Sequence, residues 1–339
     1  MNKEQWDVFA RFRAEFKEYC FRLNEEFADE LTLLQRKAAE ADTPAYSIDT
    51  AVVYNGSLEE VTEQSEIKLI LAGDNPGKNE QAAKNRKYLT GLSGKIAENF
   101  FKKHGEFDTD FRKNAIILNK TPIHTAKTKH LRFLRKNGSE AVKQLILETQ
   151  LFMAEKTARL HQELCAAAAT AEEECELWLV GYGEMKNNGI FSPYKSKLKE
   201  MYFQVARETD SKAAQPEMNR DCSKDEWRAA LFAQNPERAW NKVFAFQHFS
   251  MNRFSIDLNA FKDELNSRRL AEENPTYNMN EEHGTNNSRL FDSGIGSQRK
   301  NGFLSGKRTE SEEPAQSELS IVEVLKILGQ KHKDEIFKT

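Results

Sequence analysis

Four short apolar segments stand out along the chain, and each is followed at once by small or polar residues. The segments are residues 67–72, 115–118, 177–180 and 243–246. The clusters that follow them are Gly73-Asp74-Asn75-Pro76-Gly77, Asn119-Lys120-Thr121-Pro122, Gly181-Tyr182-Gly183-Glu184 and Gln247-His248-Phe249-Ser250. Short apolar runs bounded by turn-forming residues are typical of buried strands, so the pattern predicts four strands.

The segments around these strands carry helical periodicity. Residues 3–41 place apolar side chains at steps of three and four, which predicts one long amphipathic helix. Residues 140–174 predict a second long helix, extended by an alanine-rich stretch because alanine has the highest helix propensity. Shorter helices are expected near residues 94–104, after Pro193 and around Lys224–Phe232. Strands that alternate with helices predict an α/β fold with three layers (α/β/α), a central, mainly parallel four-stranded sheet and long flanking helices.

The carboxyl ends of all strands in a parallel α/β sheet lie at one edge, and ligands bind there. Asp74, Asn75, Asn119 and His248 each follow a predicted strand closely. The pattern therefore predicts that an acid, two amides and an imidazole from distant parts of the chain meet at this edge.

The composition changes after about residue 270. Residues 271–316 are rich in Asn, Ser, Gly and charged residues and are predicted to be a disordered linker, because they bury too little apolar surface to offset their ordering entropy. The remaining parts are an N-terminal helix packed on the core (1–45), an α/β domain (46–270) and a C-terminal helix (317–339). Three positions stay open for that last helix: docked on the domain, paired with a second copy, or bound to a protein partner.

The composition favours a soluble globular protein over a membrane-spanning or secreted one. The chain has 339 residues, of which 39% are hydrophobic and 30% charged, as expected of a soluble, helix-rich protein with a sizeable core. No segment approaches the roughly 18 consecutive apolar residues that span a membrane. The first six residues lack the apolar core of a signal peptide, so a cytoplasmic location without membrane contact is expected.

The cysteines give no recognised metal-binding spacing. They are Cys20, Cys165, Cys175 and Cys222, and no two of them form a Cys-x-x-Cys pair. A structural zinc or iron–sulfur site is therefore not expected, and reduced thiols are the simplest interpretation. We expect no metal and no cofactor.

Charge is unevenly distributed along the chain. The net charge is −3, but residues 78–136 carry 15 Lys and Arg against 5 Asp and Glu. A basic surface beside the polar edge suits a polyanionic substrate such as nucleic acid. An ordinary solvated helix surface has the same composition, and the sequence does not separate the two interpretations.

The polar clusters resemble the motifs of the uracil-DNA glycosylase superfamily. The segment Gly73–Gly77 is similar to its first loop, Leu118-Asn119 to the end of its second strand, and His248-Phe249-Ser250 to its His-Pro-Ser loop. The segment 88–94 looks like the aromatic and Gly-containing turn of the iron–sulfur branch. Each motif alone is weak, but the four occur in the family's order over roughly residues 65–260. The resemblance implies a uracil-DNA glycosylase-like fold and DNA as the partner, either single-stranded or as a mismatched duplex.

Such an enzyme must stabilise positive charge on the sugar and negative charge on the leaving base. The resemblance implies that Asp74 orients a water molecule and stabilises the sugar cation, with help from Asn75. Capping of the following turn is the alternative role for Asp74. His248 would donate a hydrogen bond to the departing base, although a lone histidine near a strand end is often structural.

The remaining site residues follow from the same resemblance. Asn119 would read the edge of uracil through its paired donor and acceptor, or else tie the loop backbone. Tyr88 would stack on a base flipped out of the duplex, or else lie in the core or at the rim. Met251, Arg253 and Phe254 are candidates to fill the gap in the duplex, and the choice among them stays open. The other implied substrate-binding residues are Gly73, Pro76, Gly77 and Ser250.

Three features depart from the family pattern, and those at Phe249 and Gly77 keep a rival function open. Phe249 stands where the family usually has proline, the cluster-binding cysteines are missing, and Gly77 follows Pro76 where the most active branch has another continuation. The first hypothesis is a metal-independent glycosylase that removes uracil or a related deaminated base in base excision repair. The alternative is an inactive or retuned superfamily member that binds nucleic acid without cleaving it.

Overall fold

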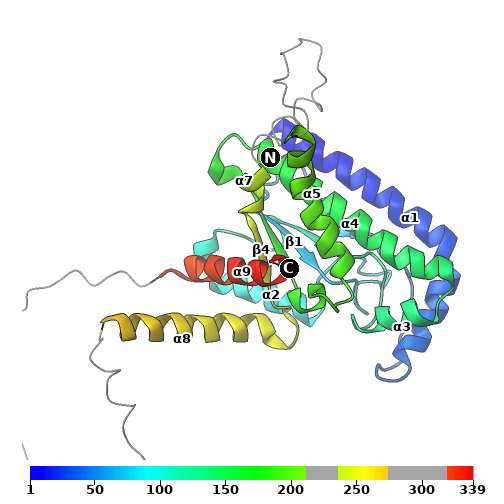
Figure 1. The fold of residues 1–339 in the computed structure, drawn as a ribbon. Coiled ribbons are helices and arrows are strands. Elements are labelled where there is room, and N and C mark those ends of the chain that lie inside the picture. The colour runs from blue at the N-terminus through cyan, green and yellow to red at the C-terminus, as the bar shows by residue number, and fades with distance from the viewer. Residues whose placement is uncertain (211–235, 274–318, 339) are drawn as a thin grey trace, which may run out of the picture.

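A parallel sheet forms the centre of the protein, whose computed structural model describes residues 1–210, 236–273 and 319–338 (Figure 1). The strands are β1 (Leu69–Gly73), β2 (Ala115–Asn119), β3 (Glu176–Val180) and β4 (Val243–Phe246). Their order is β2-β1-β3-β4, and all three neighbouring pairs are parallel. The predicted α/β class with a four-stranded parallel sheet is confirmed, and β1 to β4 coincide with the four apolar segments.

One face of the sheet is covered by long helices packed on one another (Figure 1). They are α1 (Lys3–Ala39), α3 (His130–Asn137), α4 (Glu140–Ala166) and α5 (Ser192–Asp210). The apolar stripe predicted for the N-terminal helix is buried from Phe9 to Leu34, except that Phe27 is partly exposed, as is Trp6 at its start. The short helix α7 (Pro236–Trp240) packs against α5 and leads into β4.

The other face is covered by α2 (Leu92–Lys103), α8 (Arg253–Glu273) and α9 (Ile321–Phe337). Trp178 of β3 anchors this layer, because its ring lies 5.4 Å from that of Phe101 in α2 and 4.8 Å from that of Phe246 in β4. The two helical layers around the sheet agree with the predicted three-layer arrangement.

The C-terminal helix α9 docks on its own domain, against β4 and α8 (Figure 1). Its apolar side chains Val324, Leu325, Leu328 and Ile336 are buried. Of the three positions that the sequence left open, the structure thus shows the intramolecular one. The contact is close, because a Cβ at Gly329 would lie 2.6 Å from Cζ of Phe246 and 2.8 Å from Cβ of Phe244.

Some expectations differ from the structure or fall outside it. Helix α4 ends at Ala166 rather than near 174. The Asn2 side chain donates a hydrogen bond to the Ala167 carbonyl, and the chain must then turn back to enter β3, so tertiary contacts override the alanine propensity. The helix expected at Lys224–Phe232 and nearly all of the predicted linker 271–316 lie outside the described residues. Within the described part of the chain, no helix has the length and apolar character needed to cross a membrane.

We predict that Gly329→Ala destabilises the protein. The added methyl group meets Phe244 at its Cβ, which cannot move without the β4 backbone, and such overpacking costs about 1–3 kcal/mol. This cost exceeds the gain of at most about 1 kcal/mol in helix propensity. Gly105→Ala, at a position with no atom within 4 Å, is the matched control. Thermal unfolding should show a lower Tm for Gly329→Ala alone, and an unchanged or raised Tm would contradict the docked position of α9.

Candidate functional site

The carboxyl edge of the sheet gathers the polar clusters from four separate parts of the chain. Asp74 follows β1, Asn119 ends β2, Gly181 follows β3, and His248 lies two residues after β4. Strand β3 lies between β1 and β4. Adjacent strands are about 4.8 Å apart, so the backbones that carry Asp74 and His248 are separated by roughly 10 Å, a span that two side chains can bridge to one small ligand.

Asp74 is buried, and both oxygens of its carboxylate are held by the segment that follows β2. Oδ1 accepts a hydrogen bond of 2.8 Å from the Lys120 ammonium, and Oδ2 accepts one of 3.2 Å from the Thr128 hydroxyl. The side chain keeps 10% of its surface exposed. These partners lie outside the turn that follows Asp74, so the carboxylate is fixed by tertiary contacts at the strand edge.

Lys120 is the cation at the centre of this edge, and its side chain is fully buried. Nζ donates to Asp74 Oδ1 at 2.8 Å, to the Val180 carbonyl at 2.6 Å and to the Gly73 carbonyl at 3.2 Å. An ammonium group has three donors, and here each has an acceptor. Burial lowers the pKa of Lys120, while the charge and the hydrogen bond of Asp74 raise it. The side chain therefore ties together the carboxyl ends of β1, β2 and β3.

Gly181 allows β3 to approach Asp74 closely. Its φ of +85° lies in the left-handed region, and a Cβ at this position would lie 2.5 Å from Asp74 Oδ1. A side chain here would collide with the carboxylate and carry a backbone strain that glycine avoids. The end of β3 therefore places no side chain against the carboxylate at this point.

The structure fixes the tautomer of His248. The backbone N–H of Ser250 donates to Nδ1 at 2.9 Å, so the proton of the neutral ring lies on Nε2. Burial lowers the pKa of His248, and the charges of Lys120 and Arg253 lower it further, against the opposing effect of Asp74. His248 is thus set as a neutral hydrogen-bond donor, and Ser250 orients it through its backbone rather than its hydroxyl.

Asn119 offers a second donor at the same edge. It is 2% exposed, and its Nδ2 has no hydrogen-bond partner. Gly73 makes room for it, because a Cβ there would lie 2.6 Å from Asn119 Oδ1. An unsatisfied buried donor costs about 1–3 kcal/mol, which a carbonyl oxygen of a ligand would recover.

The rest of the first loop is held by internal hydrogen bonds. Asn75 donates from Nδ2 to the Thr125 hydroxyl at 2.8 Å. The Pro76 carbonyl accepts from the Thr125 backbone at 3.1 Å, and the Gly77 N–H donates to the Glu80 carboxyl at 3.2 Å. These residues fix the path of the loop that carries Asp74, and the Asn75 amide is engaged with its own protein.

The structure separates the remaining candidates by exposure. Tyr88 is fully buried, with its hydroxyl donating to the Val53 carbonyl at 2.5 Å, so it takes the core position rather than one at the rim. Phe254 is 2% exposed and packs in the core as well. Met251 is 69% exposed at φ +54°, and Arg253 beside it is exposed at the start of α8. Met251 is therefore the exposed apolar tip of the last loop.

The basic stretch reaches this edge, but part of its charge is already paired. Lys127 and Lys129 flank Thr128, the residue that contacts Asp74, and both form ion pairs with Asp42. Arg132 pairs with Glu184 after β3. The local excess of positive charge is thus partly balanced by acids from elsewhere in the chain, as the surface interpretation expects.

A separate cavity lies at the opposite end of the sheet. Its volume is about 730 Å³, and Asn114 and Ala115 at the amino end of β2 help to line it. Acidic and basic side chains, among them Glu98 and Arg112, both face it. The cavity is distinct from the edge that carries Asp74 and His248.

The sequence pattern points to only some of the side chains that shape this edge. It does not identify Lys120, Thr128 or Gly181 as site residues, although Lys120 directly follows the last residue of β2. A lysine at that position is a usable signal, because it must either leave the sheet edge or bury its charge against an acid. The contact made by Thr128 depends on the path of a loop and has no local signature.

We predict that Lys120→Met strongly destabilises the protein. Removing one partner of a buried ion pair leaves the Asp74 charge uncompensated, at a cost of about 3–5 kcal/mol. Lys113→Met is the matched control, because that side chain is 82% exposed. Denaturant unfolding should show the loss for Lys120→Met only. The double variant Lys120→Met/Asp74→Asn should recover part of it, and equal stability of the two single lysine variants would contradict the account.

A second prediction concerns Glu80, which is buried beside the first loop. Burial raises the pKa of its carboxyl group from 4.5 to about 7. Because the folded state holds this proton more tightly than the unfolded state, the stabilisation is complete below pH 4.5 and is lost as the pH rises towards 7. The loss over that range is about 3 kcal/mol. The unfolding free energy should therefore decrease more between pH 5 and pH 8 for the parent than for Glu80→Gln. Equal decreases in the two proteins would rule out the raised pKa.

Comparisons with known proteins add no information about the site. The chain was compared with protein-family models, with curated proteins and with solved structures, and no match was found. The likeness of its motifs to the uracil-DNA glycosylase superfamily therefore stays an expectation from the sequence. What the edge can do follows from its geometry: it offers a fixed carboxylate, a neutral imidazole donor and an unsatisfied amide.

Proposed function

We propose that this protein is a DNA glycosylase that hydrolyses the N-glycosidic bond of uracil or a related deaminated base. The observation that carries the proposal is the placement of Asp74 and the Nε2–H of His248 at one sheet edge, with glycine at the end of the strand between them. Hydrolysis of this bond needs negative charge near the sugar and a donor at the base, and the edge offers one of each.

The proposed role of His248 follows from its fixed tautomer. When the bond between C1′ and the base nitrogen breaks, its electron pair leaves with the base, and charge develops on a carbonyl oxygen of that base. Because the Ser250 N–H donates to Nδ1, the neutral ring carries its proton on Nε2 and can donate it to that oxygen without first gaining a proton. Donors held in place before the reaction stabilise developing charge without reorganisation.

Asp74 acts on the other side of the broken bond. Its carboxylate stabilises the sugar cation, orients the water molecule whose oxygen bonds to C1′ as the base leaves, and accepts the proton that this water loses. The ion pair with Lys120 holds one oxygen of the carboxylate, and the Thr128 hydrogen bond holds the other. Asn75 supports this arrangement through the loop, since its amide is engaged by Thr125.

Recognition of the base rests on Asn119. Its unpartnered Nδ2 donor suits a carbonyl oxygen, which uracil carries at the position where cytosine carries an amino group. Met251 is the proposed wedge into the duplex, because it is the exposed apolar residue of the last loop. Tyr88 has no part in this proposal, because its ring is enclosed in the core.

One observation favours the alternative, a protein that binds nucleic acid without cleaving it. The Lys120 ammonium lies 2.8 Å from Asp74 and offsets part of the negative charge that a sugar cation would need. Lys127 and Lys129 beside the same edge share Asp42 as an ion-pair partner, so two lysine charges face one acid and a phosphate could still contact them in either case. The alternative predicts salt-dependent DNA binding that survives the loss of both Asp74 and His248.

The test is release of uracil from single-stranded and mismatched oligonucleotides at enzyme excess. We expect release by the parent, a loss of roughly 10²–10⁴-fold in the single-turnover rate for Asp74→Asn, and a loss of roughly 10²–10³-fold for His248→Gln. Asp7→Asn on the exposed surface of α1 is the matched control and should keep the parental rate.

The outcomes separate the two functions. Absence of base release by folded parent protein, together with DNA binding that Asp74→Asn and His248→Gln retain, would establish the binding protein instead. Base release that is unchanged in Asp74→Asn would contradict the role of the carboxylate.

A further inference from the structure

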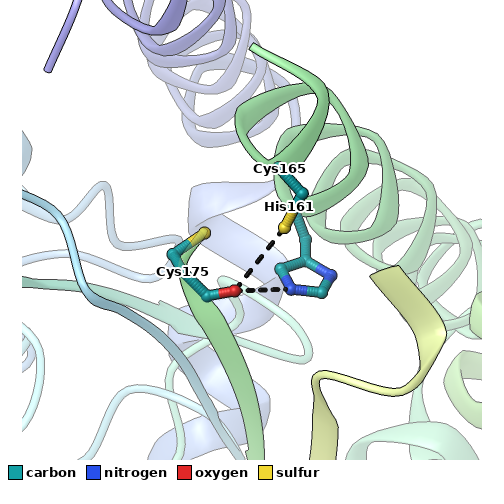
Figure 2. A group of neighbouring side chains, drawn as sticks. All are labelled: His161, Cys165 and Cys175. Carbon is teal, nitrogen blue, oxygen red and sulfur yellow. Dashed lines mark hydrogen bonds between the residues drawn. The ribbon is translucent and has the colours of Figure 1, made fainter. Parts of the chain in front are cut away.

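A second cluster of reactive side chains lies at the amino end of β3, away from the edge described above. His161 and Cys165 lie one turn apart on α4, and Cys175 immediately precedes β3 (Figure 2). The three side chains are 0%, 4% and 2% exposed. Their ligand atoms all lie within 4.8 Å of one another. Nothing in the glycosylase proposal uses them.

We propose that His161, Cys165 and Cys175 bind one Zn²⁺ ion, which joins α4 to the start of β3. Two thiolates and one imidazole form a soft donor set that selects zinc over magnesium or calcium. Zn–S bonds of about 2.3 Å and Zn–N bonds of about 2.0 Å place tetrahedral donor atoms roughly 3.5–3.8 Å apart. The present separations, which reach at most 4.8 Å, therefore need to close by no more than about 1.3 Å.

The hydrogen bonds of the cluster are compatible with their replacement by bonds to a zinc ion. Cys165 Sγ and His161 Nε2 both donate to the Cys175 carbonyl oxygen, at 3.5 Å and 3.1 Å (Figure 2). The thiol and the imidazole thus both donate to the Cys175 carbonyl oxygen. When a metal ion binds Sγ and Nε2, neither atom carries the proton that it now donates. Binding releases the two thiol protons to solvent, while the imidazole stays neutral by moving its proton from Nε2 to Nδ1.

Tyr202 lies where that moved proton needs a partner. Its hydroxyl is 2.6 Å from His161 Nδ1, and the residue is fully buried. A hydroxyl group both donates and accepts, so it can donate to Nδ1 in the metal-free form and accept from Nδ1–H in the metal-bound form. A hydrogen bond to the second ring nitrogen is the usual support of a metal-bound histidine. Tyr202 is therefore the positioning residue of the proposed site.

The fourth ligand is assigned to a water molecule. Glu174 precedes Cys175, but its carboxylate already faces Arg238 and Lys242. Cys20 lies on α1, with its thiol directed at the Val53 carbonyl, and Cys222 lies outside the described residues. The chain thus supplies a three-ligand site from its described part. The site could not be predicted from the sequence, because the spacing of His161, Cys165 and Cys175 matches no Cys-x-x-Cys pattern.

The experiment measures zinc in the full-length protein, purified under reducing conditions, exposed to Zn²⁺ and freed of excess metal. We expect about one zinc ion per chain for the parent and for the matched control Cys20→Ser, and loss of bound zinc in Cys165→Ser and Cys175→Ser. Tyr202→Phe should bind Zn²⁺ roughly 10- to 100-fold more weakly. Chelation should lower the Tm of the parent and leave that of Cys175→Ser unchanged.

A second measurement covers the case in which the cysteine variants fail to fold. Co²⁺ added to the parent should give the visible bands of a tetrahedral ion and a thiolate-to-cobalt charge-transfer band, both displaced by Zn²⁺. A parent protein that retains no zinc and gives no such bands overturns the proposal. So does a Cys165–Cys175 disulfide in the reduced preparation, detected as a mass lower by two hydrogens. These measurements do not involve DNA, so they test the zinc site independently of the proposed glycosylase activity.

Discussion

The buried ammonium group of Lys120 holds the carboxyl edge of the sheet together. Its three donors reach Asp74 and the backbone carbonyls of Gly73 and Val180, so one side chain from the end of β2 fixes the ends of β1 and β3. The arrangement costs desolvation of two charges, and it is stable only because every donor finds an acceptor. The same close packing requires glycine at position 181. The φ of Gly181 is +85°, and a Cβ there would collide with the Asp74 carboxylate.

This constraint also sets the chemistry of the edge. Burial lowers the pKa of His248, and the Lys120 charge lowers it further against the opposing effect of Asp74, so a neutral imidazole lies at the same edge as the carboxylate that Lys120 holds. The Ser250 N–H fixes the tautomer of this imidazole, and Lys120 fixes the position of the carboxylate. A fixed carboxylate and a fixed hydrogen-bond donor at one edge suit a site that stabilises separating charges. The proposed zinc ion lies at the opposite end of β3 and stabilises the fold rather than taking part in this chemistry.

The sequence was a good guide where a local pattern decides the structure. The four strands could be predicted because short continuous apolar runs report burial on both faces, and the buried stripe of α1 because its apolar residues recur at steps of three and four. The convergence of Asp74, Asn119 and His248 followed from the rule for parallel sheets. Long-range contacts could not be predicted in the same way. The end of α4 depends on Asn2, the burial of Tyr88 depends on Val53, and the Cys175 cluster depends on how α4 meets β3.

The central claim is that His248 presents a neutral Nε2–H to a base held opposite Asp74. Nitrogen-15 NMR of the histidine side chains tests this claim directly, with His248→Gln used to assign the signal. At neutral pH the account predicts the Nε2–H tautomer for His248, and a change of its Nε2 shift when the protein binds an oligonucleotide carrying a non-cleavable 2′-fluoro-deoxyuridine. A protonated ring, a proton on Nδ1, or an Nε2 signal that does not respond to the bound uracil would contradict the account.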